Sequence, residues 1–303
     1  MTESLKRTEY YYGKDNVLQN VAVWEFPEDK VAAPAPGTTK YWLVFIHGGA
    51  WRDPRSTFSE AEPTINALLD PSSQWHMPDA PPRVAGFASL NYRLSPHPSF
   101  AQDAATTPSF AARTARHPDH LDDVVSGLRF LQRRLGFGGG GSDYVLFGHS
   151  AGASLAYQAL LGPACRSEGL DDVALPAVVG FEGIYDLVGL DGRMGGGYAG
   201  FIEAAFGTDR SAWRDASPAT AAGSFGAWAG QAGPRLAVLA HSADDELVDM
   251  PEVETMERRL RVDGVRDVLV FRDLKGGHFD VLNDGSFARV LVKTLEELGR
   301  LKA

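Results

Sequence analysis

The stretch Gly148-His149-Ser150-Ala151-Gly152 decides how the rest of this 303-residue chain is interpreted. An apolar run, 144–147, precedes it, and a helix-compatible segment, 153–161, follows it. A serine between residues without bulk, on a sharp turn from a strand into a helix, has the pattern of a nucleophile elbow. A helix N-cap after a strand would give Ser150 the same surroundings. The other parts of the chain must therefore decide between the two interpretations.

Composition and charge describe an ordinary globular protein. Hydrophobic residues make up 44% of the chain and charged residues 22%, a balance that supports a large buried core. The formal net charge of −10 argues against nucleic acid and against an anionic membrane as partners, because both attract clustered Lys and Arg. Cys165 is the only cysteine, so no intrachain disulfide can form. Since no signal peptide or membrane-length apolar run is visible, we expect a cytoplasmic protein.

Strand-like and helix-like segments alternate along the chain. Strands are predicted over 17–26, 41–46, 84–92, 144–147, 176–184, 236–240 and 268–271, and helices over 59–69, 121–135, 153–161, 256–262 and 287–298. The first strand alternates apolar and polar residues, as an antiparallel edge strand does. The alternation predicts an α/β fold, a mostly parallel sheet with helices on both faces, in a single domain over 1–303.

Several segments of the chain have no clear helix or strand period. The segment 187–233, rich in Gly, Ala and aromatic residues, is interpreted as a small cap inserted into the domain. The proline-rich stretches 70–82 and 95–117 are expected to be loops, and 138–141 a flexible hinge.

A serine nucleophile needs a base and a carboxylate that orients the base. Asp244 and Asp245 follow the strand at 236–240, and His278 follows the strand at 268–271. Ligands of parallel sheets bind at the carboxyl ends of the strands, which is where these side chains fall. A loop histidine and a solvated aspartate turn are the alternatives for each residue alone. Their joint occurrence after Ser150, in the order Ser, Asp, His, predicts a catalytic triad.

An oxyanion hole is predicted from two glycine-containing turns. The backbone N–H of Ala151, next after the serine, supplies one donor. A second is expected from the turn His47-Gly48-Gly49-Ala50-Trp51, which follows the buried strand 41–46. The donor is Gly48, Gly49 or Ala50. A plain strand-to-helix turn would not require two glycines.

The remaining histidines and glycines indicate no further site. His117 and His120, three residues apart at a helix start, lack a third metal ligand and fit a helix cap. His241 is a rival base, although it lies where the acid should be. The run Gly138 to Gly141 lacks the Lys-Ser/Thr of a phosphate-binding loop. We therefore predict neither a metal nor a cofactor.

Taken together, the motifs resemble those of fungal-type kynurenine formamidases (arylformamidases) of the α/β-hydrolase fold. The turn at 47–51 is similar to the His-Gly-Gly-x-Trp signature of that family. The likeness continues in Asn91-Tyr92-Arg93-Leu94-Ser95-Pro96, Gly148-His149-Ser150-Ala151-Gly152, Asp245-Glu246-Leu247-Val248 and Gly277-His278-Phe279. The resemblance implies hydrolysis of N-formyl-L-kynurenine to L-kynurenine and formate, on the route from tryptophan to NAD. It also implies Asp245, with Asp244 as the alternative, as the triad acid.

The resemblance further implies that Ser150 attacks the formyl carbon and that His278 moves the proton. Trp51 either packs on the aromatic ring of the substrate or is buried against the cap. A general small-ester carboxylesterase of the hormone-sensitive-lipase-like type is a second function, although Ala50 stands where those esterases usually carry a third glycine. A non-catalytic ligand-binding module is a third, and an intact triad argues against it. The expected partner is a small-molecule substrate, and a homodimer is compatible with the sequence.

Overall fold

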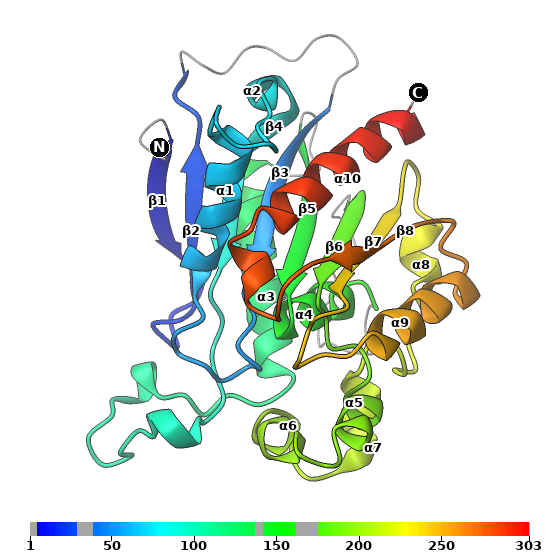
Figure 1. The fold of residues 1–303 in the computed structure, drawn as a ribbon. Helices are drawn as coiled ribbons and strands as arrows, with labels where there is room; N and C mark the ends of the chain where they lie inside the picture. The colour runs from blue at the N-terminus through cyan, green and yellow to red at the C-terminus, as the bar shows by residue number, and fades with distance from the viewer. Residues whose placement is uncertain (1–4, 29–38, 137–141, 162–174, 303) are drawn as a thin grey trace.

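The computed structural model describes residues 5–28, 39–136, 142–161 and 175–302, drawn in colour in Figure 1. The predicted hinge at 138–141 and Cys165 lie outside the described residues. Within these ranges the chain builds one eight-stranded sheet in the order β1-β2-β4-β3-β5-β6-β7-β8. The strands are β1 Lys6–Tyr11, β2 Asn20–Glu25, β3 Lys40–Ile46, β4 Val84–Leu90, β5 Ser142–His149, β6 Ala177–Phe181, β7 Leu236–Ser242 and β8 Asp267–Leu274.

The strands from β3 to β8 run parallel, and only β1 and β2 pair in antiparallel fashion. The mostly parallel sheet confirms the predicted fold class. The edge position expected for the first strand was wrong, because β2 lies between β1 and β4 and is buried along most of its length. Strand β1 is largely exposed and carries Lys, Arg, Thr, Glu and Tyr, so it has no apolar stripe by which the sequence would reveal it.

Helices cover both faces of the sheet (Figure 1). They are α1 Glu62–Leu69, α2 Ala80–Arg83, α3 Asp119–Leu135, α4 Ala151–Gln158, α5 Leu187–Arg193, α6 Ala199–Phe206, α7 Arg210–Ala216, α8 Gly226–Ala229, α9 Pro251–Val262 and α10 Ser286–Lys302. The apolar sides of α1 and α10 pack in one core, with Leu68 and Phe287 fully buried, and those of α3, α4 and α9 pack in the other. Each core removes one face of the parallel sheet from water, as such sheets require.

The segment interpreted as a cap consists mainly of the short helices α5 to α8. Figure 1 shows α5, α6 and α7 below the sheet, beyond the carboxyl ends of the central strands. The proline-rich stretch 70–82 includes the start of α2, and 95–117 contains two single-turn 3-10 helices, Pro98–Phe100 and Ser109–Ala111. Among the helices of the described ranges, none combines the length and apolar character that crossing a bilayer demands.

Candidate active site

Ser150 stands on a sharp turn between β5 and α4, in a backbone conformation that side-chain-bearing residues rarely adopt. Its φ is 53° and its ψ is −120°, and its N–H donates to the carbonyl of Phe181 at the end of β6 (2.8 Å). A Cβ on Gly152 would lie 2.1 Å from the carbonyl oxygen of Ile46, so only glycine lets α4 approach β3 this closely. Strain of this kind persists where the surrounding structure enforces it, and it commonly marks functional sites.

His278 and Asp245 meet at the carboxyl ends of β8 and β7. The Nδ1 of His278 donates to Oδ2 of Asp245 at 2.8 Å. The other carboxylate oxygen of Asp245 accepts the backbone N–H groups of Leu247 and Val248, at 2.8 and 2.9 Å. Asp244 instead faces the backbone N–H of Gly276 at 3.4 Å. Of the two aspartates between which the sequence did not decide, Asp245 is therefore the one that contacts the histidine.

Burial and hydrogen bonding act in opposite directions on this pair. Burial by itself lowers the pKa of His278, but hydrogen bonds to Asp245 and Glu182 outweigh it and raise the pKa to about 9. Burial likewise raises the pKa of Asp245, yet the hydrogen bonds from His278 and Glu182 hold it well below its usual range. The Asp245 carboxylate thus stays ionised, and it holds the proton of His278 on Nδ1. When His278 is neutral, its Nε2 is free to accept a proton.

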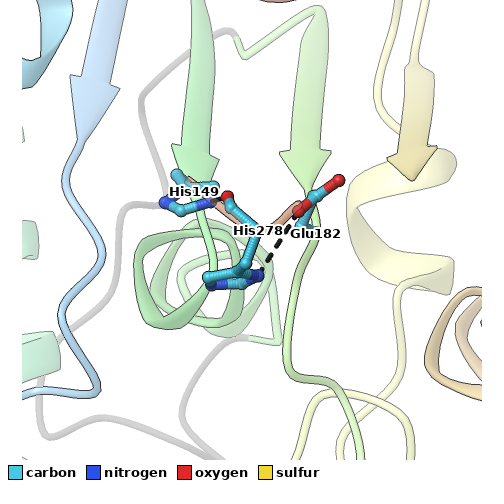
Figure 2. A group of neighbouring side chains, drawn as sticks. All are labelled: His149, Glu182 and His278. Carbon is cyan, nitrogen blue, oxygen red and sulfur yellow. Dashed lines mark hydrogen bonds and ion pairs between the residues drawn. The ribbon is translucent and has the colours of Figure 1, made fainter. Parts of the chain in front are cut away.

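Two residues that the sequence analysis did not single out lie against His278, and Figure 2 shows them with it at the ends of β5 and β6. The Nε2 of His149 donates to the carbonyl oxygen of His278 (2.9 Å), and Oε2 of Glu182 lies 3.3 Å from Nδ1 of His278. Glu182 had been placed inside the predicted strand 176–184. The signal that could have revealed it is a lone carboxyl directly after an apolar run, at the edge where Asp245 and His278 also fall.

His149, Glu182 and His278 bring ligand-type atoms within 4.8 Å of one another, a spacing that could suit a metal ion. The donor set does not fit one, because Nδ1 of His278 already carries the hydrogen bond to Asp245 and Nε2 of His149 donates to a carbonyl oxygen. A metal held between Glu182 and Nδ1 of His278 would have to break the contact between His278 and Asp245. We therefore assign the three side chains to the hydrogen-bond system around His278.

The turn after β3 has three consecutive residues with positive φ: Gly49 at 86°, Ala50 at 48° and Trp51 at 59°. The hydroxyl of Tyr92 holds the turn from behind by donating to the carbonyls of His47 and Gly48, at 3.1 and 2.9 Å. Gly49 and Ala50 line the same cavity as Ser150 and His278. Gly48 and Ala151, the other predicted oxyanion donors, contribute no lining surface there.

The cavity that contains Ser150 and His278 has a volume of about 230 Å³ and a mainly apolar wall that includes Phe201 and Phe279. A second cavity of about 800 Å³ adjoins it along the segment 96–114, and the two share Arg52 and His97. The Arg52 guanidinium lies 5.7 Å from the centre of the Phe201 ring. Among the described residues, no carboxylate lies within ion-pair distance of it. Arg52 therefore lines both cavities without an ion-pair partner in the described part of the chain.

Trp51, expected as a candidate substrate contact, does not line the active-site cavity. Only 1% of its surface is exposed, and its ring packs edge-on against Phe206 of α6 at 4.9 Å. Its positive φ turns the side chain into the core, so the structure corresponds to the alternative, burial beneath the cap.

Three histidines of the sequence motifs, His117, His120 and His241, do not line the cavity. Nε2 of His120 lies 3.0 Å from the hydroxyl of Ser95, and burial lowers the pKa of His117 to about 4. Nε2 of His241 donates to the carbonyl of Val248 at 2.8 Å, behind Asp245. His120 and His241 therefore hold neighbouring segments in place, and His117 is a half-buried, neutral side chain.

Comparison with known proteins connects this site to a group of hydrolases. No protein-family model matches the chain. A kynurenine formamidase-like hydrolase of Fusarium equiseti is 38% identical over 257 residues, covering 82% of this chain and 80% of that protein. A kynurenine formamidase of Aspergillus versicolor is 34% identical over 264 residues, covering 80% and 84%. Among solved structures, a hormone-sensitive lipase from a metagenome library aligns with a TM-score of 0.62 at 17% identity, covering 98% of this chain and 86% of that one.

Proposed function

Because the chain belongs to the kynurenine formamidase family, we propose that it hydrolyses the formyl amide of N-formyl-L-kynurenine to L-kynurenine and formate. The observation that carries the proposal is the hydrogen bond between Asp245 and His278 in the wall of the cavity that contains Ser150. A serine on a strained turn, a histidine with one nitrogen fixed by a carboxylate, and free backbone donors are the parts that acyl transfer to water requires.

In the first half of the reaction, Oγ of Ser150 attacks the formyl carbon while Nε2 of His278 takes the hydroxyl proton. The carbonyl oxygen becomes an oxyanion, for which we propose the N–H groups of Gly49, Ala50 and Ala151 as donors. Gly48 is the least suited of the four predicted donors, because its backbone hydrogen-bonds toward the Glu60 carboxyl, whose pKa burial raises to about 7. Collapse of the tetrahedral intermediate breaks the C–N bond, and His278 returns the proton to the departing arylamine.

In the second half, water attacks the formyl ester on Ser150. His278 again takes a proton, this time from water, and gives it to the serine oxygen as formic acid leaves, which then ionises to formate in solution. Both halves use the same base and the same oxyanion donors, so no metal or cofactor is needed to balance the reaction.

The cavity suits an aromatic amide that carries an amino-acid group. Phe201 and Phe279 offer apolar surface for the aryl ring, next to Ser150 and His278. Arg52 stands where this cavity adjoins the larger one, without a carboxylate partner among the described residues. We infer that its guanidinium binds the α-carboxylate of the substrate, since Arg recognises carboxylates through paired N–H donors.

Formate release from N-formyl-L-kynurenine by the purified protein, in the presence of a metal chelator, tests the proposal. Ser150→Ala should lower kcat/KM by a factor of about 10⁴ or more with the melting temperature retained. A Ser150→Ala variant with wild-type turnover would exclude a serine mechanism. If short acyl esters are turned over with a far higher kcat/KM than the formyl amide, the protein is a general carboxylesterase instead.

A further inference from the structure

A second carboxyl group shares the imidazole of His278 with Asp245. Asp245 follows β7 and lies 2.8 Å from Nδ1 of His278, while Glu182 follows β6 and lies 3.3 Å from the same nitrogen. Neither carboxylate side chain is exposed to solvent. Glu182 thus occupies a second strand end from which an acid can reach the base, and the mechanism described above does not use it.

The backbone of Glu182 has a conformation that residues with side chains rarely adopt, and two hydrogen bonds to β7 hold it there. Its φ is 49°, its N–H donates to the carbonyl of Ala240 at 2.9 Å, and its Oε1 accepts the N–H of Ser242 at 3.1 Å. The preceding residue, Phe181, accepts the N–H of Ser150. These contacts direct the second oxygen, Oε2, toward His278 and Asp245, and they maintain this geometry although the positive φ of Glu182 is unfavourable.

Two buried carboxyl groups this close cannot both be ionised without a large penalty. Burial, together with the hydrogen bond and charge of Asp245, raises the pKa of Glu182 to about 8 against the opposing effect of His278. Asp245, with two backbone donors on its other oxygen, keeps the negative charge. At neutral pH the proton therefore belongs to Glu182.

We propose that Glu182 is a positioning residue of the catalytic triad, whose neutral carboxyl donates a hydrogen bond to Asp245 and which ionises to orient His278 when Asp245 cannot. The inference rests on the proposed serine-hydrolase function, although not on the identity of the substrate. Each step conserves protons, because Glu182 only keeps or releases the one proton that the carboxyl pair holds.

The other charged or titratable groups around this pair do not replace Glu182. His149 at the end of β5 and His241 at the end of β7 have their pKa lowered by burial, so both are neutral. Glu246 binds the backbone N–H of His278 through its carboxylate, at 3.1 Å, and leaves the ring to the other two acids.

A pH profile of Glu182→Gln tests the proposal. The amide keeps the shape and the donor of a neutral carboxyl but cannot ionise. Above the pKa of Glu182, about 8, the variant therefore lacks the second negative charge that favours protonated His278. We expect the acid limb of kcat/KM to move down by about one pH unit, with KM changed less than about twofold. Hydrolysis of p-nitrophenyl acetate is the readout, since it requires the serine mechanism and not the formyl substrate.

Glu252→Gln is the matched control. Glu252 is equally buried, but it accepts the N–H groups of Tyr185 and Asp186 and pairs with Arg193, away from His278. This control should lower the melting temperature and leave the acid limb in place. An unmoved acid limb in Glu182→Gln, or an equal movement in Glu252→Gln, would overturn the proposal. A Ser150→Ala variant that hydrolyses the ester as fast as the wild type would count against the proposed serine mechanism instead.

A second measurement does not depend on how Glu182→Gln folds. Loss of the orienting carboxylate of a triad costs about 10⁴ in kcat. In Asp245→Asn the charge that suppresses ionisation of Glu182 is gone, so we expect Glu182 to take over and limit the loss to about 10². The double variant Asp245→Asn/Glu182→Gln should show the full loss. A single variant that already falls by about 10⁴ contradicts the inference.

Discussion

The carboxyl edge of the sheet and the helices α5 to α7 beyond it are built in different ways. At the edge, Ala50, Ser150 and Glu182 have positive φ, and ionisable side chains are buried against one another. In helix α6, the aromatic side chains of Phe201 and Phe206 pack on Trp51, and Phe201 also lies beside Arg52. The edge thus holds the groups for bond breaking, and the helices supply apolar surface beside them.

The contrast indicates that the edge and the helices have different functions. Strained backbone and buried charge cost stability, and they persist only where the parallel strands on both sides enforce the geometry. Apolar contacts on short helices tolerate exchange at little cost in geometry. Changes at the edge should therefore alter the rate of the chemical step, and changes where the helices meet the edge should alter which substrate binds.

The largest change expected from the edge is the fall of kcat/KM at acid pH. The pKa of His278 is raised to about 9, and its base form is the neutral one, so protonation removes activity at a higher pH than for an ordinary histidine. We expect kcat/KM to fall about tenfold per pH unit on the acid side, with a midpoint above pH 7. A kinetic profile from pH 5 to 10 measures it. A midpoint at or below 6.5 would mean that the two buried carboxyls do not act on the base.

Gly49→Ala tests whether the edge depends on its backbone geometry. The added Cβ would lie 2.8 Å from the side chain of Ser56, at a φ of 86°, so the oxyanion turn must shift. Loss of one oxyanion donor costs about 10² to 10³ in kcat, which initial-rate kinetics will measure. Gly264→Ala has nearly the same φ, 83°, with no atom within 4 Å, and should lower the melting temperature without lowering kcat. Equal kcat in both variants would separate the turn from catalysis.

The positions of three side chains at this edge could be predicted from the sequence. Ser150, Asp245 and His278 each follow an apolar run, and a parallel sheet brings such strand ends together whatever the intervening loops do. The residue pattern could not choose between Asp244 and Asp245, because neighbouring side chains at a strand end point in different directions. The N–H groups of Leu247 and Val248 hold the carboxylate of Asp245 in place, and these contacts are visible only in the structure. Glu182 was missed for the same reason: its positive φ turns the carboxyl toward His278, and no residue pattern records that turn.

The helices beyond the edge were predicted only as a segment without a clear period. Helices α5 to α8 are four to eight residues long, too short for a stripe of apolar positions to repeat. Trp51 illustrates the consequence. Its place in the motif suggested the substrate, whereas contacts with Phe201 and Phe206, some 150 residues further along the chain, place it in the core.

Arg52→Met tests substrate choice where the edge meets the helices. Loss of a charged contact to the α-carboxylate should raise KM for N-formyl-L-kynurenine about tenfold. N-(2-acetylphenyl)formamide has the same aryl formamide without the amino-acid group, and its KM should change less than twofold. Arg55→Met is the control, because Arg55 is exposed and already paired with Asp53 at 2.7 Å. A parallel rise in KM for both substrates would argue that Arg52 shapes the cavity rather than binding the carboxylate.

Trp51→Phe should have the smallest effect on activity. It tests whether a residue of the edge that contacts the helices affects stability without affecting catalysis. The smaller ring loses part of its contact with Phe206 beneath the cap, and we expect a loss of about 1 to 3 kcal/mol in the free energy of unfolding. KM and kcat for the formyl amide should stay within about twofold, because the ring does not line the cavity. Denaturant unfolding and steady-state kinetics on one preparation separate the two quantities. A tenfold rise in KM with unchanged stability would place Trp51 on the substrate, and the boundary between edge and helices would then run through this residue.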